Sequence, residues 1–141
     1  MATEYRNHNY LISTDKSLLD LTVMHEFLTR AYWCPGITVE RIRSRVENSL
    51  CFGLYEEQKQ IGFARVVTDF SSMAYLADVF IIEEYRGRKL SKWLINTIMN
   101  YPDLQDMRLW LLRTKDAHGL YRQFGFVPAE APENLLELRK K

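Results

Sequence analysis

Four positively charged residues occur within seven positions in the middle of the 141-residue chain: Arg86, Arg88, Lys89 and Lys92. They follow an apolar run over 73–82 and precede apolar residues at helical spacing from Leu90 onward. The pattern predicts a strand, a turn and the first turn of a helix. Backbone N–H groups at a helix N-terminus bind phosphate, and cations there oppose the helix dipole unless an anion binds. The segment is therefore a candidate phosphate site, while a solvated basic turn fits the spacing equally well.

Two further residues could move a proton. Tyr121 lies in 117–126, where the apolar residues have the spacing of a short helix. A phenol has a pKa of about 10 and can donate a proton, although spacing alone favours a core aromatic. Asp78 is the only carboxylate within the apolar run 73–82, so it must be paired, solvated or functional. A functional role for the carboxylate and its pairing with an arginine such as Arg65 are equally compatible with that position.

Aromatic side chains make up 13% of the chain, and two large ones, Tyr32 and Trp33, are adjacent near the end of a predicted helix. Aromatic rings bind cations face-on or stack on planar groups, and they also simply cover a core. The neighbouring Cys34 has no base beside it in the sequence, so it is not expected to be a nucleophile.

The elements that must position these residues follow an α/β pattern. The spacing predicts strands over 10–13, 51–55, 61–67, 73–82, 107–112 and 135–138, and helices over 21–32, 38–50, 90–101 and 116–124. The order is β-α-α-β-β-β-α-β-α-β, with hairpins and one β-α-β crossover. On the second helix, Arg45 and the other charged residues are assigned to a solvated face.

Composition excludes several other classes of protein. The length suits one domain over 1–141, and the net charge of +1 argues against a protein that coats a polyanion. The two cysteines and three histidines suggest neither a disulfide framework nor a metal site. No signal-peptide pattern and no apolar run of about 20 residues occur. We therefore expect a cytoplasmic protein with reduced thiols that binds neither membranes nor nucleic acid.

Two segments are similar to motifs of one family. Tyr85-Arg-Gly-Arg-Lys-Leu-Ser91 resembles the acetyl-CoA signature of the Gcn5-related N-acetyltransferases (GNAT), with Arg86 at its first position but Lys89 and Ser91 at its glycine positions. Residues 117–126 resemble the later family motif Ala-x-x-Leu-Tyr-x-x-x-Gly-Phe. Thr114 stands where the family has Asn. The two motifs lie in the family's order, separated by one predicted helix and one predicted strand.

This resemblance implies a mixed, mostly antiparallel sheet flanked by helices and transfer of an acetyl group from acetyl-CoA to a primary amine. The acceptor would be a small amine or an exposed protein amino group, attacking directly with Tyr121 as general acid. Asp78 would orient the amine or relay its proton, since 77–81 resembles a segment of polyamine and small-amine acetyltransferases. The acceptor would bind Tyr32, Trp33 and Asp78. The residues expected to hold acetyl-CoA are Val79, Phe80, Ile81, Arg86, Gly87, Arg88, Lys89, Leu90, Ser91, Lys92 and Thr114.

Two other functions remain open from the sequence. The missing motif glycines are compatible with a sensor or interaction module that binds an acyl-CoA without turnover. Nucleic-acid binding through the basic segment 86–92 is a third and weaker alternative, because the balanced total charge disfavours it. Many family members are dimers, so the resemblance leaves homodimer formation open as well.

Overall fold

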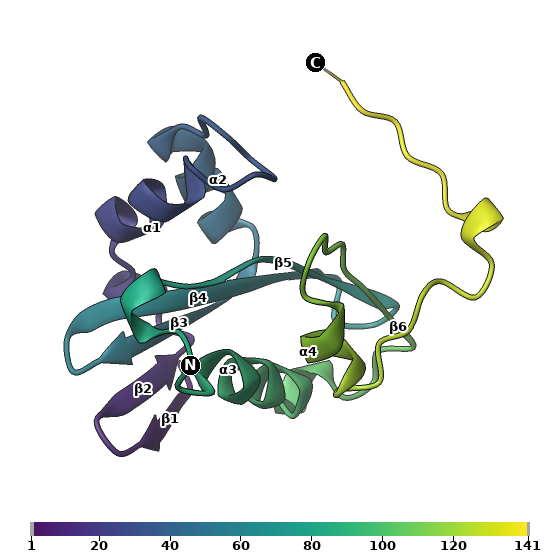
Figure 1. Cartoon of the computed structure of the whole chain (residues 1–141). Coiled ribbons are helices and arrows are strands. Elements are labelled where there is room, and N and C mark those ends of the chain that lie inside the picture. The colour runs from purple at the N-terminus through teal and green to yellow at the C-terminus, as the bar shows by residue number, and fades with distance from the viewer. Residues whose placement is uncertain (1, 141) are drawn as a thin grey trace.

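The computed structural model describes residues 2–140 and contains a six-stranded sheet whose strands follow one another in chain order (Figure 1). Every neighbouring pair is antiparallel except the last, β5 and β6, which is parallel. A parallel pair needs a crossover, which the helix α3 (Leu90–Met99) supplies. The strands are β1 (Glu4–Asn7), β2 (Tyr10–Ser13), β3 (Leu50–Glu56), β4 (Lys59–Thr68), β5 (Met73–Ile81) and β6 (Leu109–Leu111).

Helices cover both faces of this sheet. The helices α1 (Leu21–Leu28) and α2 (Val39–Glu47) lie on one face, and α3 and α4 (His118–Arg122) lie on the other (Figure 1). Each face has its own apolar core: Met24, Ile42 and Phe63 belong to the first, and Phe52 and Leu94 to the second. The sheet is therefore the middle of three layers.

The helix starts differ in a way that matters for the site. Asp20 caps α1 by accepting from the amides of Thr22 and Val23, and Thr38 caps α2 in the same manner. No side chain caps α3, whose N-cap residue Lys89 has a left-handed φ of 63°. The start of α3 consequently keeps backbone donors of the kind that the cap side chains satisfy in α1 and α2.

A β-bulge in β5 sets which way its side chains point. The pairing of β4 with β5 shifts between Phe63 and Arg65, and Asp78 at this point has a left-handed φ of 52°. Leu76, before the shift, packs in the core on the α3 face. Phe80, after it, packs against α1 and α2. Because a bulge adds one residue to a strand, Asp78 and Phe80 point to the face that odd-numbered residues occupied before it.

The strands β5 and β6 separate after a short contact. They pair only at Met73–Tyr75 with Leu109–Leu111. Beyond Tyr75, a cavity of about 510 Å³ lies between the second half of β5 and the segment 112–117 that follows β6. The parallel edge of β5 is therefore open over its last residues.

The α/β class and the mostly antiparallel sheet flanked by helices are confirmed, but the expected element order is wrong at both ends. The N-terminus forms a hairpin, β1 with β2, joined by the two residues His8 and Asn9. The strand expected over 135–138 is absent: Leu136 and Leu138 there are 88% and 82% exposed. Pairing of this segment with β6 is disfavoured by the two prolines that precede it, at 128 and 132, and by the turn at Pro132–Asn134, which directs the chain away from the sheet.

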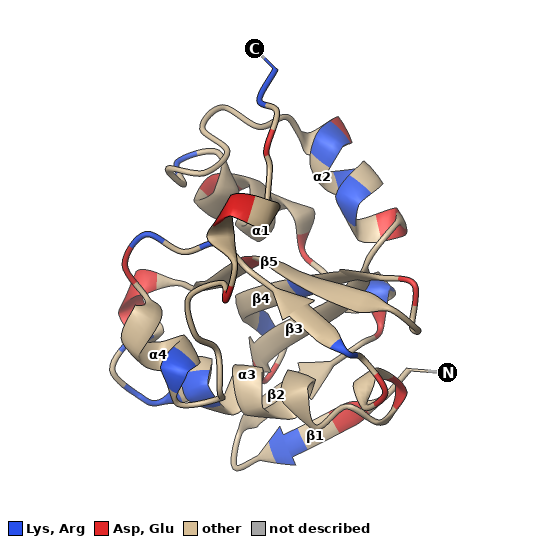
Figure 2. Cartoon of the chain, turned by 90° about the vertical axis from the view of Figure 1, so that its right-hand side faces the viewer, with Lys and Arg blue, Asp and Glu red and all other residues tan. Residues whose placement is uncertain are grey.

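Positions of charged residues of both signs are spread over many elements of the chain in Figure 2, and α2 carries several of the positive ones. Within residues 2–140, every helix is too short or too polar to cross a lipid bilayer.

Candidate active site between β5 and β6

The cavity between β5 and β6 brings together residues that are far apart in the sequence. Its lining includes the predicted acceptor residues Tyr32, Trp33 and Asp78, together with Tyr121 and Thr114. They come from the α1–α2 loop, β5, the segment after β6, and α4. The structure therefore places both candidate proton-handling residues and both candidate acceptor aromatics on one cavity.

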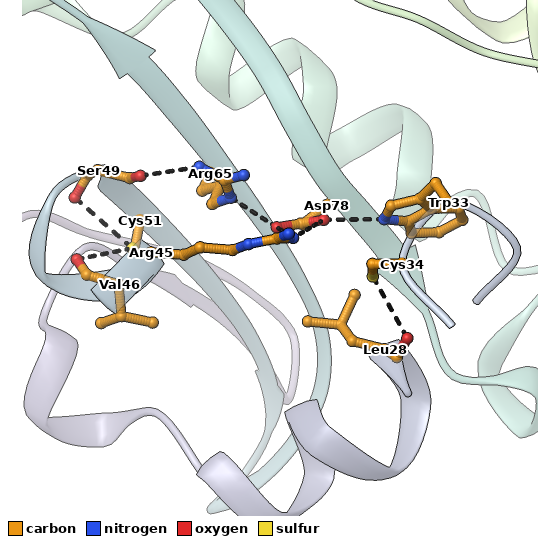
Figure 3. Close-up of polar contacts among 9 residues, drawn as sticks. All are labelled: Leu28, Trp33, Cys34, Arg45, Val46, Ser49, Cys51, Arg65 and Asp78. Atoms are coloured by element: carbon orange, nitrogen blue, oxygen red, sulfur yellow. Dashed lines mark hydrogen bonds and ion pairs between the residues drawn. The ribbon is translucent and has the colours of Figure 1, made fainter. Parts of the chain in front are cut away.

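Asp78 is the centre of a buried ionic cluster in this cavity (Figure 3). Its Oδ2 accepts from Arg65 Nε at 2.6 Å and from Arg45 Nη1 at 3.0 Å. Its Oδ1 accepts from Trp33 Nε1 at 2.8 Å. The Asp78 side chain is 3% exposed, against 14% for Arg65 and 32% for Arg45. We call Arg45, Arg65 and Asp78 the arginine cluster.

These contacts decide the charge of Asp78. Burial alone would raise its pKa, but the hydrogen bond and charge of Arg65, with Trp33 and Arg45, outweigh burial and hold the pKa below its usual value. Both carboxylate oxygens are already accepting hydrogen bonds. The pairing with Arg65, which the sequence left open beside a proton relay, is thus present.

Arg45 is the residue that sequence reasoning missed. It was assigned to a solvated face of α2, whereas its guanidinium reaches Asp78 across the α1–α2 side of the sheet (Figure 3). Its neighbours Arg41 and Arg43 do face solvent. Nothing in the spacing separates these three arginines, because the bulge that aims Asp78 toward Arg45 lies on another element.

Tyr121 lines the same cavity from α4. It is 8% exposed, its ring packs edge-on to Phe126, and its hydroxyl makes no hydrogen bond with residues 2–140. Burial raises the pKa of Tyr121 to about 12, and the nearby Tyr32 and Asp116 add to this. The hydroxyl therefore keeps its proton throughout the neutral pH range.

The two predicted acceptor aromatics differ in their contacts. Trp33 is bound to Asp78, while the Tyr32 hydroxyl accepts from the backbone N–H of Lys115, and the Lys115 ammonium lies over the Tyr32 ring. Tyr32 thereby joins the α1–α2 loop to the segment after β6. Burial raises the pKa of the nearby Cys34 thiol, which remains protonated at neutral pH.

Backbone groups at the end of β5 alternate between those that face β4 and those that face the open edge of the strand. Ile82 N–H donates to Ile61 C=O of β4, and the carbonyl of Ile81 accepts from Arg86 Nε. Since backbone groups alternate along a strand, Val79 and Ile81 face away from β4, whereas Phe80 faces it. The Phe80 ring stacks on Phe27 at 4.2 Å between centroids. Of the three strand residues expected to hold acetyl-CoA, Val79 and Ile81 therefore have suitable backbone groups and Phe80 does not.

Residues 86–92, which we call the phosphate segment, follow β5 and lead into α3. The amides from Gly87 to Lys92 donate to no acceptor among residues 2–140. Gly87 has a φ of 81°, and a Cβ there would meet nothing within 4 Å. An uncapped helix start preceded by left-handed residues forms a concave set of N–H donors, which suits a phosphate group.

The four cations of the phosphate segment are not equivalent. Arg88 donates to the Tyr10 hydroxyl at 3.0 Å and lies over the Tyr85 ring, so it is directed toward the N-terminal hairpin. Arg86 is held by the Ile81 carbonyl and lies over Phe27. Lys89 and Lys92 are exposed and make no side-chain hydrogen bond with the described residues. Thr114 lies apart from the segment and accepts from the amide of Ala117.

Comparison with known proteins shows that this fold is that of an acetyltransferase domain. Residues 47–128 match the model of the acetyltransferase (GNAT) domain. A crystal structure of a GNAT-family protein from Xanthomonas campestris superposes with a TM-score of 0.91 at 41% identity, covering 96% of each chain. A Gibberella zeae protein provisionally named an acetyltransferase is 27% identical, over 83% of this chain and 78% of its own.

A further solved structure shares the fold at low identity. It is an acetyltransferase from Clostridium acetobutylicum determined with acetyl-CoA, with a TM-score of 0.66 at 14% identity over 99% of this chain. The chain belongs to the GNAT acetyltransferase family, whose members use acetyl-CoA as the acetyl donor, and it is an acyltransferase.

Proposed function

We propose that the protein transfers an acetyl group from acetyl-CoA to a primary amine bound in the cavity between β5 and β6, with residues 1–141 acting as one domain. One observation carries the proposal: Tyr121, with a free hydroxyl, lines a cavity at the open edge of β5, and that edge leads to the uncapped start of α3. An extended ligand along this edge would reach from a phosphate site to a proton donor.

The residues present suit acetyl-CoA. The amides of Gly87–Lys92 would hold its pyrophosphate, with Lys92 as a free cation, and the backbone of Val79 and Ile81 would bind its pantetheine arm. A backbone N–H of β5 near the thioester would also polarise its carbonyl. When bound, acetyl-CoA supplies an activated acetyl group on a thiol leaving group.

The protein's part in the reaction is to orient the amine and to supply one proton. The amine nitrogen bonds to the thioester carbon, the carbon–sulfur bond breaks, and the amine gives up a proton to water. The Tyr121 hydroxyl donates a proton to the departing sulfur and is then reprotonated by water. A pKa of about 12 keeps this donor protonated at neutral pH.

Asp78 has a positioning role in this proposal. A carboxylate that accepts from two arginines and an indole, with a lowered pKa, is a poor proton acceptor for an amine. It holds Arg45, Arg65 and Trp33 at the acceptor side of the cavity instead.

Kinetics of Tyr121→Phe tests the proposal. With acetyl-CoA and a panel of amines, kcat should fall by about 10²–10⁴-fold while acetyl-CoA affinity stays unchanged. Tyr101→Phe is the matched control, because Tyr101 is another buried tyrosine of the same core and does not line the cavity. An unchanged kcat in Tyr121→Phe would refute the assignment of the acid.

A sensor without turnover is the alternative, and one observation favours it. Lys89 holds a left-handed φ at a glycine position of the motif, which strains the loop that must hold the pyrophosphate. This alternative predicts acetyl-CoA binding by calorimetry but no CoA release with any amine.

A further inference from the structure

The cavity between β5 and β6 has an excess of positive charge. At its rim, Glu137 accepts from both Arg113 and Arg139. In its most buried part, Asp78 alone faces two guanidinium groups. Among the lining residues, five side chains are cationic and two are acidic: Arg45, Arg65, Arg113, Lys115 and Arg139 against Asp78 and Asp116.

The two arginines of the cluster also keep unused donors. Arg45 binds Asp78 through Nη1, and its Nε and Nη2 donate to no oxygen or nitrogen atom of residues 2–140, although the Cys34 thiol lies close to the guanidinium. Arg65 binds Asp78 through Nε and Ser49 through Nη1, which leaves its Nη2 without an acceptor among the same residues. The Nε–Nη2 edge of a guanidinium presents two parallel N–H groups that match the two oxygens of a carboxylate.

The side chains of the arginine cluster are held in a fixed arrangement. Asp78 adopts a left-handed φ, which is uncommon for a residue with a Cβ, and residues in such conformations are concentrated at functional sites. Trp33 fixes the other carboxylate oxygen at 2.8 Å. Arg45 is therefore presented to the cavity by a preformed arrangement, with a third of its side chain accessible.

We propose that the acceptor of this acetyltransferase carries a carboxylate that binds to Arg45 and Arg65, so that the acceptor is a small amino acid or a similar amino-carboxylate compound. The inference rests on the proposed function for the reacting amine. Tyr121 and Arg45 line one cavity of about 510 Å³, so the amine and the carboxylate belong to one small molecule. A polyamine is disfavoured, because its additional cations would face the arginines.

Matched acceptor pairs test this substrate class. CoA release is measured with β-alanine and ethylamine, L-lysine and cadaverine, and L-phenylalanine and phenethylamine, where each pair differs by one carboxylate. Phosphoethanolamine is included because a phosphate could occupy the same donors. The carboxylated member of at least one pair should have the lower KM.

Substitution of Arg45 then separates carboxylate binding from a structural role. Arg45→Met should raise the KM for the amino acid about 10–100-fold, the effect of losing a charged hydrogen bond, with a much smaller change in kcat. Arg45→Lys should recover part of the KM, and Arg45→Met should change the KM for the decarboxylated amine by a smaller factor than the KM for the amino acid. Arg43→Met is the control, since Arg43 lies on the same helix and faces solvent.

The outcomes distinguish this inference from the proposed function. A preference for the decarboxylated amines or for phosphoethanolamine, or a KM insensitive to Arg45→Met, overturns the inference and leaves acetyl transfer intact. If no acceptor is acetylated, the proposed function fails. The inference is then tested separately by measuring the binding of N-acetyl-β-alanine, a carboxylate compound, by calorimetry. Binding that Arg45→Met weakens at least tenfold supports a carboxylate site, and absence of binding overturns it.

Discussion

The two ends of the second half of β5 are both basic but are built in different ways. The phosphate segment is contiguous in the chain, and its donors are backbone amides at the start of α3. The arginine cluster joins α2, β4 and β5, and its donors are side chains around one buried carboxylate. The first is exposed and open, and the second is largely buried and strained.

This difference indicates which kind of ligand each end suits. Backbone N–H groups bind a phosphate whatever side chains the loop carries. Such a site suits an acetyl donor that is common to a whole family. Side chains from three elements can change independently, which fits an acceptor that varies among family members. The comparison therefore predicts large effects of substitution in the arginine cluster and small ones in the phosphate segment.

Replacing Asp78 should have the largest effect on stability. Asp78→Asn leaves two guanidinium groups facing each other without a carboxylate, and breaking a buried ion pair in this way costs about 3–5 kcal/mol. Urea unfolding of the variant measures this loss. Asp106→Asn, at an exposed position without hydrogen bonds to residues 2–140, should change stability by less than about 0.5 kcal/mol.

The same carboxylate gives the stability a pH dependence with a defined sign. Because folding lowers the pKa of Asp78, its contribution is complete above the unfolded value of about 3.9 and is lost as the pH falls through the folded value. The stability of the wild type should thus fall more steeply than that of Asp78→Asn below about pH 4. Parallel pH profiles would contradict the assignment.

Removing the phosphates from the donor should have the next largest effect. At a hundredfold its Kd, acetyl-CoA should stabilise the protein by about 2.7 kcal/mol. S-acetylpantetheine lacks the phosphates, and losing two charged hydrogen bonds weakens binding at least about a hundredfold, which leaves about 0.4 kcal/mol at the same concentration. Thermal unfolding with each compound measures the difference. Equal stabilisation would show that the phosphate segment binds no phosphate.

The cations of the phosphate segment should separate into two groups. Lys92→Gln should weaken acetyl-CoA binding by several fold, in line with about 1 kcal/mol for one exposed charge. Arg88→Gln should leave the affinity unchanged, because Arg88 is engaged by Tyr10 and Tyr85. Calorimetric titration compares the two variants, and an equal loss in both would mean that Arg88 leaves the hairpin on binding.

Lys89→Gly should have the smallest effect. A glycine at the left-handed N-cap removes a backbone strain of about 1–2 kcal/mol, but the extra freedom of glycine in the unfolded chain costs about 0.5–1 kcal/mol. Stability should therefore rise by between about 0 and 1.5 kcal/mol. Glu57→Gly, at another left-handed residue in the turn between β3 and β4, should give a similar gain. A fall in stability would show that the Lys89 side chain is needed by the fold.

The same contrast explains what could be predicted from the sequence. The phosphate segment and the Tyr121 motif are contiguous, so their residue types and spacing placed them on the right elements. Arg45 could not be distinguished from Arg41 or Arg43, because its role depends on a bulge in a strand that follows it by more than thirty residues. Helical spacing reports which side chains are apolar, not which charged side chain meets a distant carboxylate.

The ends of the sheet were mispredicted for a different reason. The residues of β1 are polar because an edge strand buries little, so apolar alternation does not mark it. The segment 135–138 does have an apolar pattern, but strand formation requires a partner that the prolines at 128 and 132 keep at a distance.

The short pairing of β5 with β6 has a consequence for how the molecule opens. Among residues 2–140, β5 and β6 are joined along the backbone by three residue pairs, to which side-chain contacts such as that of Arg113 with the Tyr75 hydroxyl add. Amide hydrogens of β6 and α4 should therefore exchange with solvent through local opening, at a lower free energy than those of β3 and β4. A ligand lying between the separated strands would contact both sides of this weak link. Binding of such a ligand should slow the exchange of amide hydrogens most in β6 and α4, which are far along the chain from the loop that holds its phosphates.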